Sequence, residues 1–172
     1  MKVGIVGFGT IGFEVCKRID QGVENFKLIG ISSRSKENIL KKMHLFKIKP
    51  EILDLEDLCK KSDIIIDCAP KDAFKKILQN CLCNQKKLLT ISGSGILENF
   101  KTVTDAKKSK TQVMLASGAI LGLDGLRAAS EGKIFSVTMV TKKPPNALKS
   151  AKFVLENKIS LEKLSDPKII FK

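Results

Sequence analysis

The feature that most constrains the fold is a glycine pattern near the N-terminus, Gly7-Phe8-Gly9-Thr10-Ile11-Gly12. A short β-branched run at residues 3–6 precedes it, and apolar residues at helical spacing follow it at positions 11, 15 and 19. A strand, a glycine turn and a helix are therefore predicted in that order. In this context the glycines allow a tight turn, a close approach of the backbone to a pyrophosphate, and close packing of helix on strand. The N-terminus of the helix would offer free N–H groups to the anion.

Strand-length apolar segments alternate with segments of helical periodicity as far as about residue 118. Strands are expected at 26–31, 63–69, 88–91 and 112–116, and helices at 36–46, 74–82 and 96–108. Because parallel strands need crossover connections, this alternation predicts an α/β fold, a Rossmann-type doubly wound parallel sheet over residues 1–118. A second domain is expected to begin at residue 119, with a helix at 120–130, a strand at 134–140, a helix after Pro145 and a strand-like run at 169–171. These elements are too few to close an independent core, so we expect residues 119–172 to be an incomplete domain.

The end of the second expected strand bears on the choice of cofactor. Domains of this type that bind NAD carry an Asp or Glu about 20 residues after the last glycine, where it binds the ribose 2′-OH. Here that position is Ser32, followed by Ser33 and Arg34. A guanidinium pairs well with a phosphate through charge-assisted hydrogen bonds. We therefore expect use of NADP, or of both NADP and NAD, in preference to NAD alone.

Charge and aromatic content argue against a nucleic-acid partner. The chain has 31 Lys and Arg against 18 Asp and Glu, a net charge of +13. The lysines are scattered as pairs along the chain, and there is no Trp or Tyr to stack on bases. We interpret the excess of lysine as a solvated surface.

Other site types are disfavoured by what the chain carries. No apolar stretch approaches the length that a bilayer requires, and the N-terminus lacks the apolar middle of a signal peptide. The five cysteines include no Cys-x-x-Cys pair, so reduced thiols are expected, with no disulfide framework and no metal site. The single histidine, His44, lies in a lysine-rich stretch and receives no role. These observations together predict a cytoplasmic protein.

Two longer motifs resemble one family, the L-aspartate dehydrogenases. The first is the stretch Ser117-Gly118-Ala119-Ile120-Leu121-Gly122-Leu123-Asp124-Gly125-Leu126. The second is the strand-like segment 137–141 with the Lys-Pro-Pro-Asn-Ala-Leu sequence at 143–148. Asp67-Cys68-Ala69-Pro70 matches the family's turn after its fourth strand, and residues 92–96 resemble its Ser/Gly-rich loop after the fifth. The resemblance covers nearly the whole chain.

The resemblance implies that residues 119–172 are the start of an α+β open-sheet catalytic domain, through which the full-length enzymes form homo-oligomers. It implies NAD(P)-dependent oxidation of the small-molecule substrate L-aspartate to iminoaspartate, which hydrolyses to oxaloacetate and ammonia or feeds quinolinate and NAD biosynthesis. Cofactor contacts are implied for Cys68, Ala69, Pro70 and Ala119. The family's catalytic histidine and a cofactor-contacting asparagine would follow Phe171, so no catalytic residue is assigned and we expect the chain to lack the catalytic end.

Two alternatives stay open. Another amino-acid or sugar-acid dehydrogenase with the same two-domain plan would carry the same glycine loop. A non-catalytic NAD(P)-binding regulatory module would need no further catalytic residue.

Overall fold

A computed structural model describes residues 1–106, 108–118, 122–162, 164 and 166–171. The chain divides into two compact units, Met1–Leu121 and Gly122–Lys172. Ala119, to which the resemblance assigns a cofactor contact, lies outside the described residues.

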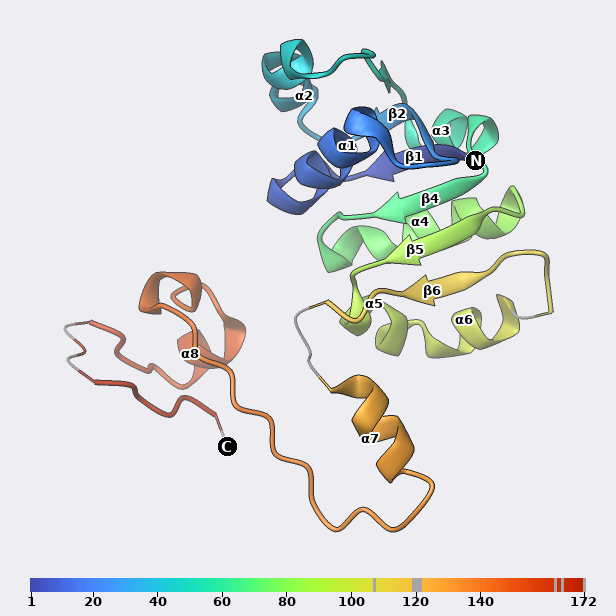
Figure 1. The fold of residues 1–172 in the computed structure, drawn as a ribbon. Helices are drawn as coiled ribbons and strands as arrows, with labels where there is room; N and C mark the ends of the chain where they lie inside the picture. Colours follow the sequence, from blue (N-terminus) through green and yellow to red (C-terminus); the bar gives the residue numbers. More distant parts are fainter. Residues whose placement is uncertain (107, 119–121, 163, 165, 172) are drawn as a thin grey trace. The chain divides into compact units, whose positions relative to one another are not determined.

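The first unit is built on a six-stranded sheet in which every paired strand is parallel (Figure 1). Its strands are β1 (Lys2–Val6), β2 (Lys27–Ser32), β3 (Glu51–Ile52), β4 (Ile64–Asp67), β5 (Lys87–Thr90) and β6 (Val113–Leu115). They lie in the order β3-β2-β1-β4-β5-β6. This is the doubly wound order of a Rossmann fold, so the predicted fold class is confirmed. The order reverses between β1 and β4, and ligands of such sheets bind beyond the carboxyl ends of the strands at that point.

Helices cover both faces of this sheet. They are α1 (Thr10–Gly22), α2 (Lys36–Lys42), α3 (Leu55–Lys61), α4 (Phe74–Cys83), α5 (Gly93–Glu98) and α6 (Phe100–Ala106), with single 3₁₀ turns at η1 (Met43–Leu45) and η2 (Lys71–Ala73). Side chains of α1 and α2 pack on one face of β1 around Val3 and Ile5. Side chains of α3 and α4 pack on the other face around Val6 and Ile65. Alternate residues of one strand thus enter two cores, which explains why the central strands are apolar throughout.

Two helices and one strand of the first unit differ from expectation. The helix expected at 36–46 ends at Lys42 and continues as η1, and the helix expected at 96–108 is two helices that meet at Asn99. Strand β3 was not predicted, because two residues are too short to show an alternating pattern. The buried face of α1 is formed by Gly12, Cys16 and Ile19, whereas Ile11 is 53% exposed.

The second unit contains α7 (Leu123–Ala129), the 3₁₀ turn η3 (Pro145–Ala147) and α8 (Lys152–Glu156). We expected strands at 134–140 and 169–171. The described residues of this unit form no strand, so both predictions are wrong. A strand needs a neighbour to satisfy its N–H and C=O groups, and the described part of this unit supplies none. Phe135, Val137 and Met139 are accordingly more than half exposed. In α8 the only buried residue is Val154.

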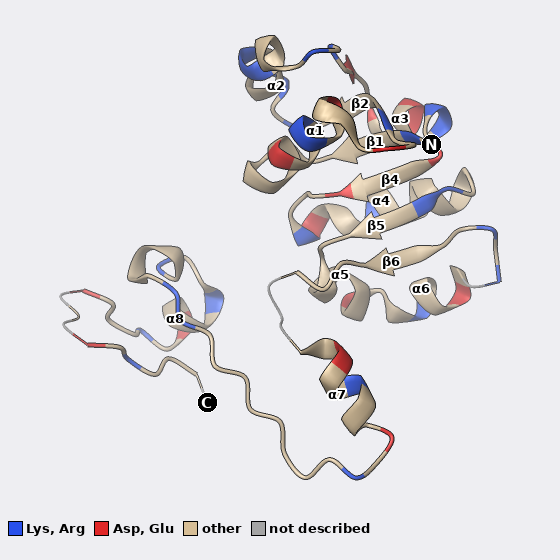
Figure 2. Cartoon of the chain, viewed as in Figure 1, with Lys and Arg blue, Asp and Glu red and all other residues tan. Residues whose placement is uncertain are grey.

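Lys and Arg are distributed over many elements, α1, α2, α3 and α4 among them (Figure 2). Within the described ranges, no helix is long and apolar enough to cross a membrane.

Candidate dinucleotide-binding site

The loop between β1 and α1 lies at the carboxyl edge of the sheet, beside the point where the strand order reverses. Gly9 is the N-cap of α1 and no side chain caps the helix. The amide of Phe13 donates to the carbonyl oxygen of Gly9 at 3.0 Å, which begins the helical ladder. The amides of the preceding first turn have no such helical partner, and they add to the positive end of the dipole of a 13-residue helix. This is an arrangement that binds anions.

Two of the three glycines of the loop are required by packing. Gly7 has φ +91°, and a Cβ there would lie 2.7 Å from the backbone of Cys68 and Ala69. A Cβ on Gly12 would collide with the carbonyl oxygen of Gly7. A Cβ on Gly9 would meet nothing within 4 Å. The first and last glycines are therefore required by packing, whereas Gly9 leaves open space in front of the loop.

The end of β2 is joined to this loop. The amide of Gly7 donates to the carbonyl oxygen of Ser32 at 2.8 Å. Ser32 and Ser33 are partly exposed and Arg34 is exposed. Among the described residues, the Arg34 guanidinium has no hydrogen bond or ion pair, so it is available to an external anion.

The turn after β4 forms the other side of the loop. The amide of Cys68 donates to the carbonyl oxygen of Val6 at 2.8 Å, and Cys68 and Ala69 lie against the backbone of Gly7. Cys68 and Ala69 are half-buried and Pro70 is exposed. Thr10 and Ile11, in the first turn of α1, are exposed as well. All the candidate residues in the described part of the chain thus lie in, or directly beside, the segments that follow β1, β2 and β4 at one edge of the sheet.

A buried polar network lies beneath these loops, and sequence reasoning assigned it no role. Asp67 Oδ1 accepts from the amide of Ala69 at 2.9 Å, and Asp67 Oδ2 accepts from the Thr90 hydroxyl at 2.7 Å. The Thr90 hydroxyl oxygen accepts from the amide of Ser92 at 3.0 Å, and Ser92 Oγ accepts from the amide of Gly95 at 3.2 Å. Asp67 is 1% exposed and Thr90 is fully buried. One sequence signal could have identified this network: a polar residue, Asp67 or Thr90, ends each of the two apolar strands β4 and β5.

Burial governs the ionisation of two groups in this region. It raises the pKa of Asp67, and the hydrogen bonds from Thr90 and from the Ala69 amide oppose that effect. Burial, with a smaller contribution from the Asp67 charge, raises the pKa of Cys68 to about 11. The Cys68 thiol is therefore a neutral, half-buried group at physiological pH.

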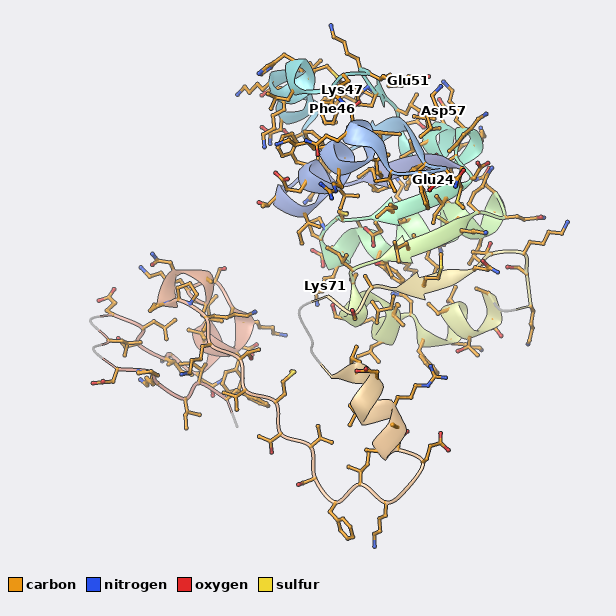
Figure 3. The ribbon with its side chains drawn as sticks, viewed as in Figure 1. Glu24, Phe46, Lys47, Glu51, Asp57 and Lys71 are labelled. Carbon is orange, nitrogen blue, oxygen red and sulfur yellow. The ribbon has the colours of Figure 1, made fainter. Side chains whose placement is uncertain are left out.

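The segment that follows β4 is also connected to helix α5. Lys71, labelled in Figure 3, forms an ion pair with Glu98 of α5 at 3.1 Å. Both side chains are more than half exposed, so the pair contributes little to stability.

A hollow of about 520 Å³ lies at the opposite, amino edge of β6, lined by Val103, Ala106 and residues 109–113. It is remote from the three loops, and we assign it no part in the site.

Two protein-family models match the chain. Residues 7–116 match the family described as homoserine dehydrogenase, NAD binding domain. Residues 124–172 match the family described as aspartate dehydrogenase, C-terminal. The first match covers most of the first unit, including the glycine loop, and the second covers most of the second unit.

Three curated relatives of the chain are named L-aspartate dehydrogenase. The chain is 32% identical to the L-aspartate dehydrogenase of Bradyrhizobium diazoefficiens over 99% of its own length, and 34% identical to that of Methanocella arvoryzae over 99%. The corresponding value for Methanococcoides burtonii is 31% over 99%. The chain spans 61%, 64% and 65% of these three relatives, respectively.

Solved structures agree on the fold at low sequence identity. A probable dehydrogenase from Thermotoga maritima has a TM-score of 0.60 at 14% identity, covering 76% of this chain and 41% of that one. The UDP-N-acetylglucosamine 3-dehydrogenase of Acidithiobacillus ferrooxidans has a TM-score of 0.60 at 13% identity, covering 77% and 44%. Together, the doubly wound sheet, the glycine loop and the match over residues 7–116 show that the chain belongs to the family described as homoserine dehydrogenase, NAD binding domain.

Proposed function

We propose that the carboxyl edge of the first unit binds a nicotinamide dinucleotide, with its pyrophosphate at the first turn of α1. The observation that carries this proposal is the open space in front of Gly9, next to a helix N-terminus without a side-chain cap, where the strand order reverses. Gly7, Gly9, Thr10, Ile11 and Gly12 would border the pyrophosphate. The family match over residues 7–116 supports this assignment.

The two halves of the cofactor would lie on the two sides of this loop. Ser32, Ser33 and Arg34 would surround the 2′ position of the adenosine ribose. Arg34 is exposed and has no partner among the described residues, which favours a 2′-phosphate, so we propose NADP, or NADP and NAD, as the cofactor. From the β4 side, the cofactor would be contacted by Cys68, Ala69 and Pro70. Ala119 would contact it as well, by its place in the motif that resembles the L-aspartate dehydrogenases.

The proposed reaction is the oxidation of L-aspartate. L-Aspartate and NAD(P)⁺ give iminoaspartate, NAD(P)H and a proton, and water then converts iminoaspartate to oxaloacetate and ammonia. The cofactor supplies the hydride acceptor, and the protein orients it against the substrate Cα. The names of the relatives support this activity, and a role in supplying NAD biosynthesis belongs to the same proposal. We further propose a cytoplasmic location, which suits the free thiols, and homo-oligomers for the full-length enzyme.

Isothermal titration of the purified chain with NAD(H) and NADP(H) tests cofactor binding. Saturable heat with at least one of them is expected. A folded chain that gives no heat with any of the four contradicts the proposal. For the activity, the measurement is formation of NAD(P)H from L-aspartate, with D-aspartate and L-glutamate as matched control substrates. Equal rates with L-glutamate would favour a different amino-acid dehydrogenase.

A further inference from the structure

Asp67 places a carboxyl group in the buried end of β4. Removing a charged group from water costs free energy unless hydrogen bonds compensate it. Asp67 follows three isoleucines of β4 and stands opposite Thr90 in the register of β4 and β5. Its retention at 1% exposure therefore calls for a role other than packing.

The hydrogen bonds of Asp67 show what it holds in place. One carboxylate oxygen accepts from Ala69, in the turn after β4. The other accepts from Thr90, whose hydroxyl oxygen accepts from Ser92 in the loop after β5. The carbonyl oxygen of Thr90 accepts from the amide of Ala116, just beyond β6, at 2.9 Å. Asp67 and Thr90 thus join the loops that follow β4, β5 and β6.

These three loops flank one half of the proposed site. The adenosine half of the dinucleotide is proposed to lie toward Ser32, on the β2 side of the glycine loop. A dinucleotide that crosses the sheet at the reversal of strand order then extends its nicotinamide half over β4 and β5. The oxidised nicotinamide ring carries a positive charge and the reduced ring is neutral, so a fixed negative charge beneath these loops acts differently on the two forms.

We infer that Asp67 is a positioning residue of the cofactor site: through Thr90 and Ala69 it holds the loops after β4 and β5, and its negative charge favours the oxidised cofactor over the reduced one. This inference rests on the proposed function. The charge effect separates it from a purely structural role, because a distorted site weakens binding of both forms alike.

The experiment is isothermal titration at pH 8 of the unmodified chain, Asp67→Asn and Thr90→Val with the oxidised and reduced forms of whichever dinucleotide the chain binds. Asp67→Asn should raise the ratio of the oxidised-form Kd to the reduced-form Kd by about threefold to tenfold, the order expected for loss of one charge about 12–25 Å from the ring at an effective dielectric constant of about 20. Thr90→Val keeps the charge and loses a hydrogen bond, so it should weaken both forms and leave the ratio within about twofold. Thr90→Ser restores the hydroxyl and should restore both constants.

An unchanged ratio in a folded Asp67→Asn variant overturns the charge effect, while cofactor binding by the unmodified chain leaves the proposed function standing. If Asp67→Asn does not fold, the Thr90→Val and Thr90→Ser variants test the positioning role. Cofactor binding by Thr90→Val that is as strong as in the unmodified chain overturns that role. An unmodified chain that binds neither form overturns this inference and the proposed function together.

Discussion

The amide of Gly7 donates a 2.8 Å hydrogen bond to the carbonyl oxygen of Ser32. This bond joins the glycine loop after β1 to the end of β2, so that the proposed pyrophosphate and 2′-phosphate positions belong to one rigid edge of the sheet. Substitutions on the two sides should therefore affect different parts of the same ligand.

Gly9→Val should weaken cofactor binding without loss of stability. The backbone at Gly9 has φ −79° and ψ −161°, a conformation open to any residue, and a Cβ there meets nothing within 4 Å. The added side chain would fill the space proposed for the pyrophosphate, so the Kd should rise by at least about tenfold, or 1.4 kcal/mol. Titration calorimetry and urea unfolding measure the two effects.

Gly12→Ala is the matched contrast. Its Cβ would collide with the carbonyl oxygen of Gly7, and α1 would have to move away from β1. We expect a loss of about 1–3 kcal/mol in the free energy of unfolding, as for overpacking in a core. Loss of stability in Gly9→Val, or unchanged stability in Gly12→Ala, would show that the loop is packed differently.

Arg34→Ala should weaken NADPH binding by about 1.5–3 kcal/mol, the range for a hydrogen bond to a charged group, and leave NADH binding nearly unchanged. The exposed Lys41 of α2 supplies the control, because Lys41→Ala removes one positive charge from the next helix without touching the end of β2. Equal losses for the two cofactors in Arg34→Ala would exclude a contact between Arg34 and the 2′-phosphate. An effect of Lys41→Ala as large as that of Arg34→Ala would indicate general electrostatic attraction.

The sequence predicted the sheet, and the edge that we propose for the cofactor, because each depends on local signals. A β-branched run before Gly7 and helical spacing after Gly12 identify a strand, a turn and a helix without knowledge of the rest of the fold. Parallel strands then bring their carboxyl ends to one edge, which groups Gly9, Ser32 and Cys68. No distance between these residues was needed for that step.

Other features depend on contacts that sequence periodicity does not report. Asp67 and Thr90 meet only because β4 and β5 pair in one particular register. Ile11 shares the helical spacing of Val15 and Ile19, but it is 53% exposed, because the buried face of α1 is formed by Gly12, Cys16 and Ile19. The segment 134–140 alternates like a strand, yet alternation alone does not supply the neighbouring strand that its backbone needs.

Alkylation of Cys68 should be slow and should be slowed further by the cofactor. With a pKa raised by burial to about 11, only about one Cys68 thiol in a thousand is ionised at pH 8, and the thiolate is the reactive form. Exposed Cys83 is the internal reference, and Cys83→Ser removes its signal. Iodoacetamide labelling followed by peptide mass spectrometry should show Cys83 labelled first, with NADPH protecting Cys68 alone. Cys68 labelling that NADPH leaves unchanged would argue against a contact with the turn after β4.

The last prediction concerns the effect of pH on the stabilising role of Asp67. Burial raises the pKa of this carboxyl above its value of 3.8 in an unfolded chain, so the fold favours the protonated form. The stability that this preference contributes is fully present below the unfolded pKa and is lost as the pH rises through the folded pKa. The free energy of unfolding of the unmodified chain, minus that of Asp67→Asn, should therefore be most positive near pH 3 and decline toward pH 7, by about 1.4 kcal/mol for each unit of pKa difference. Urea unfolding from pH 3 to 8 measures this difference.

In a Thr90→Val background the decline should move to higher pH, because the Thr90 hydrogen bond lowers the Asp67 pKa. A difference that instead grows from pH 3 to pH 7 would mean that the fold stabilises the Asp67 carboxylate, and that its hydrogen bonds with Thr90 and Ala69 outweigh the cost of burying its charge.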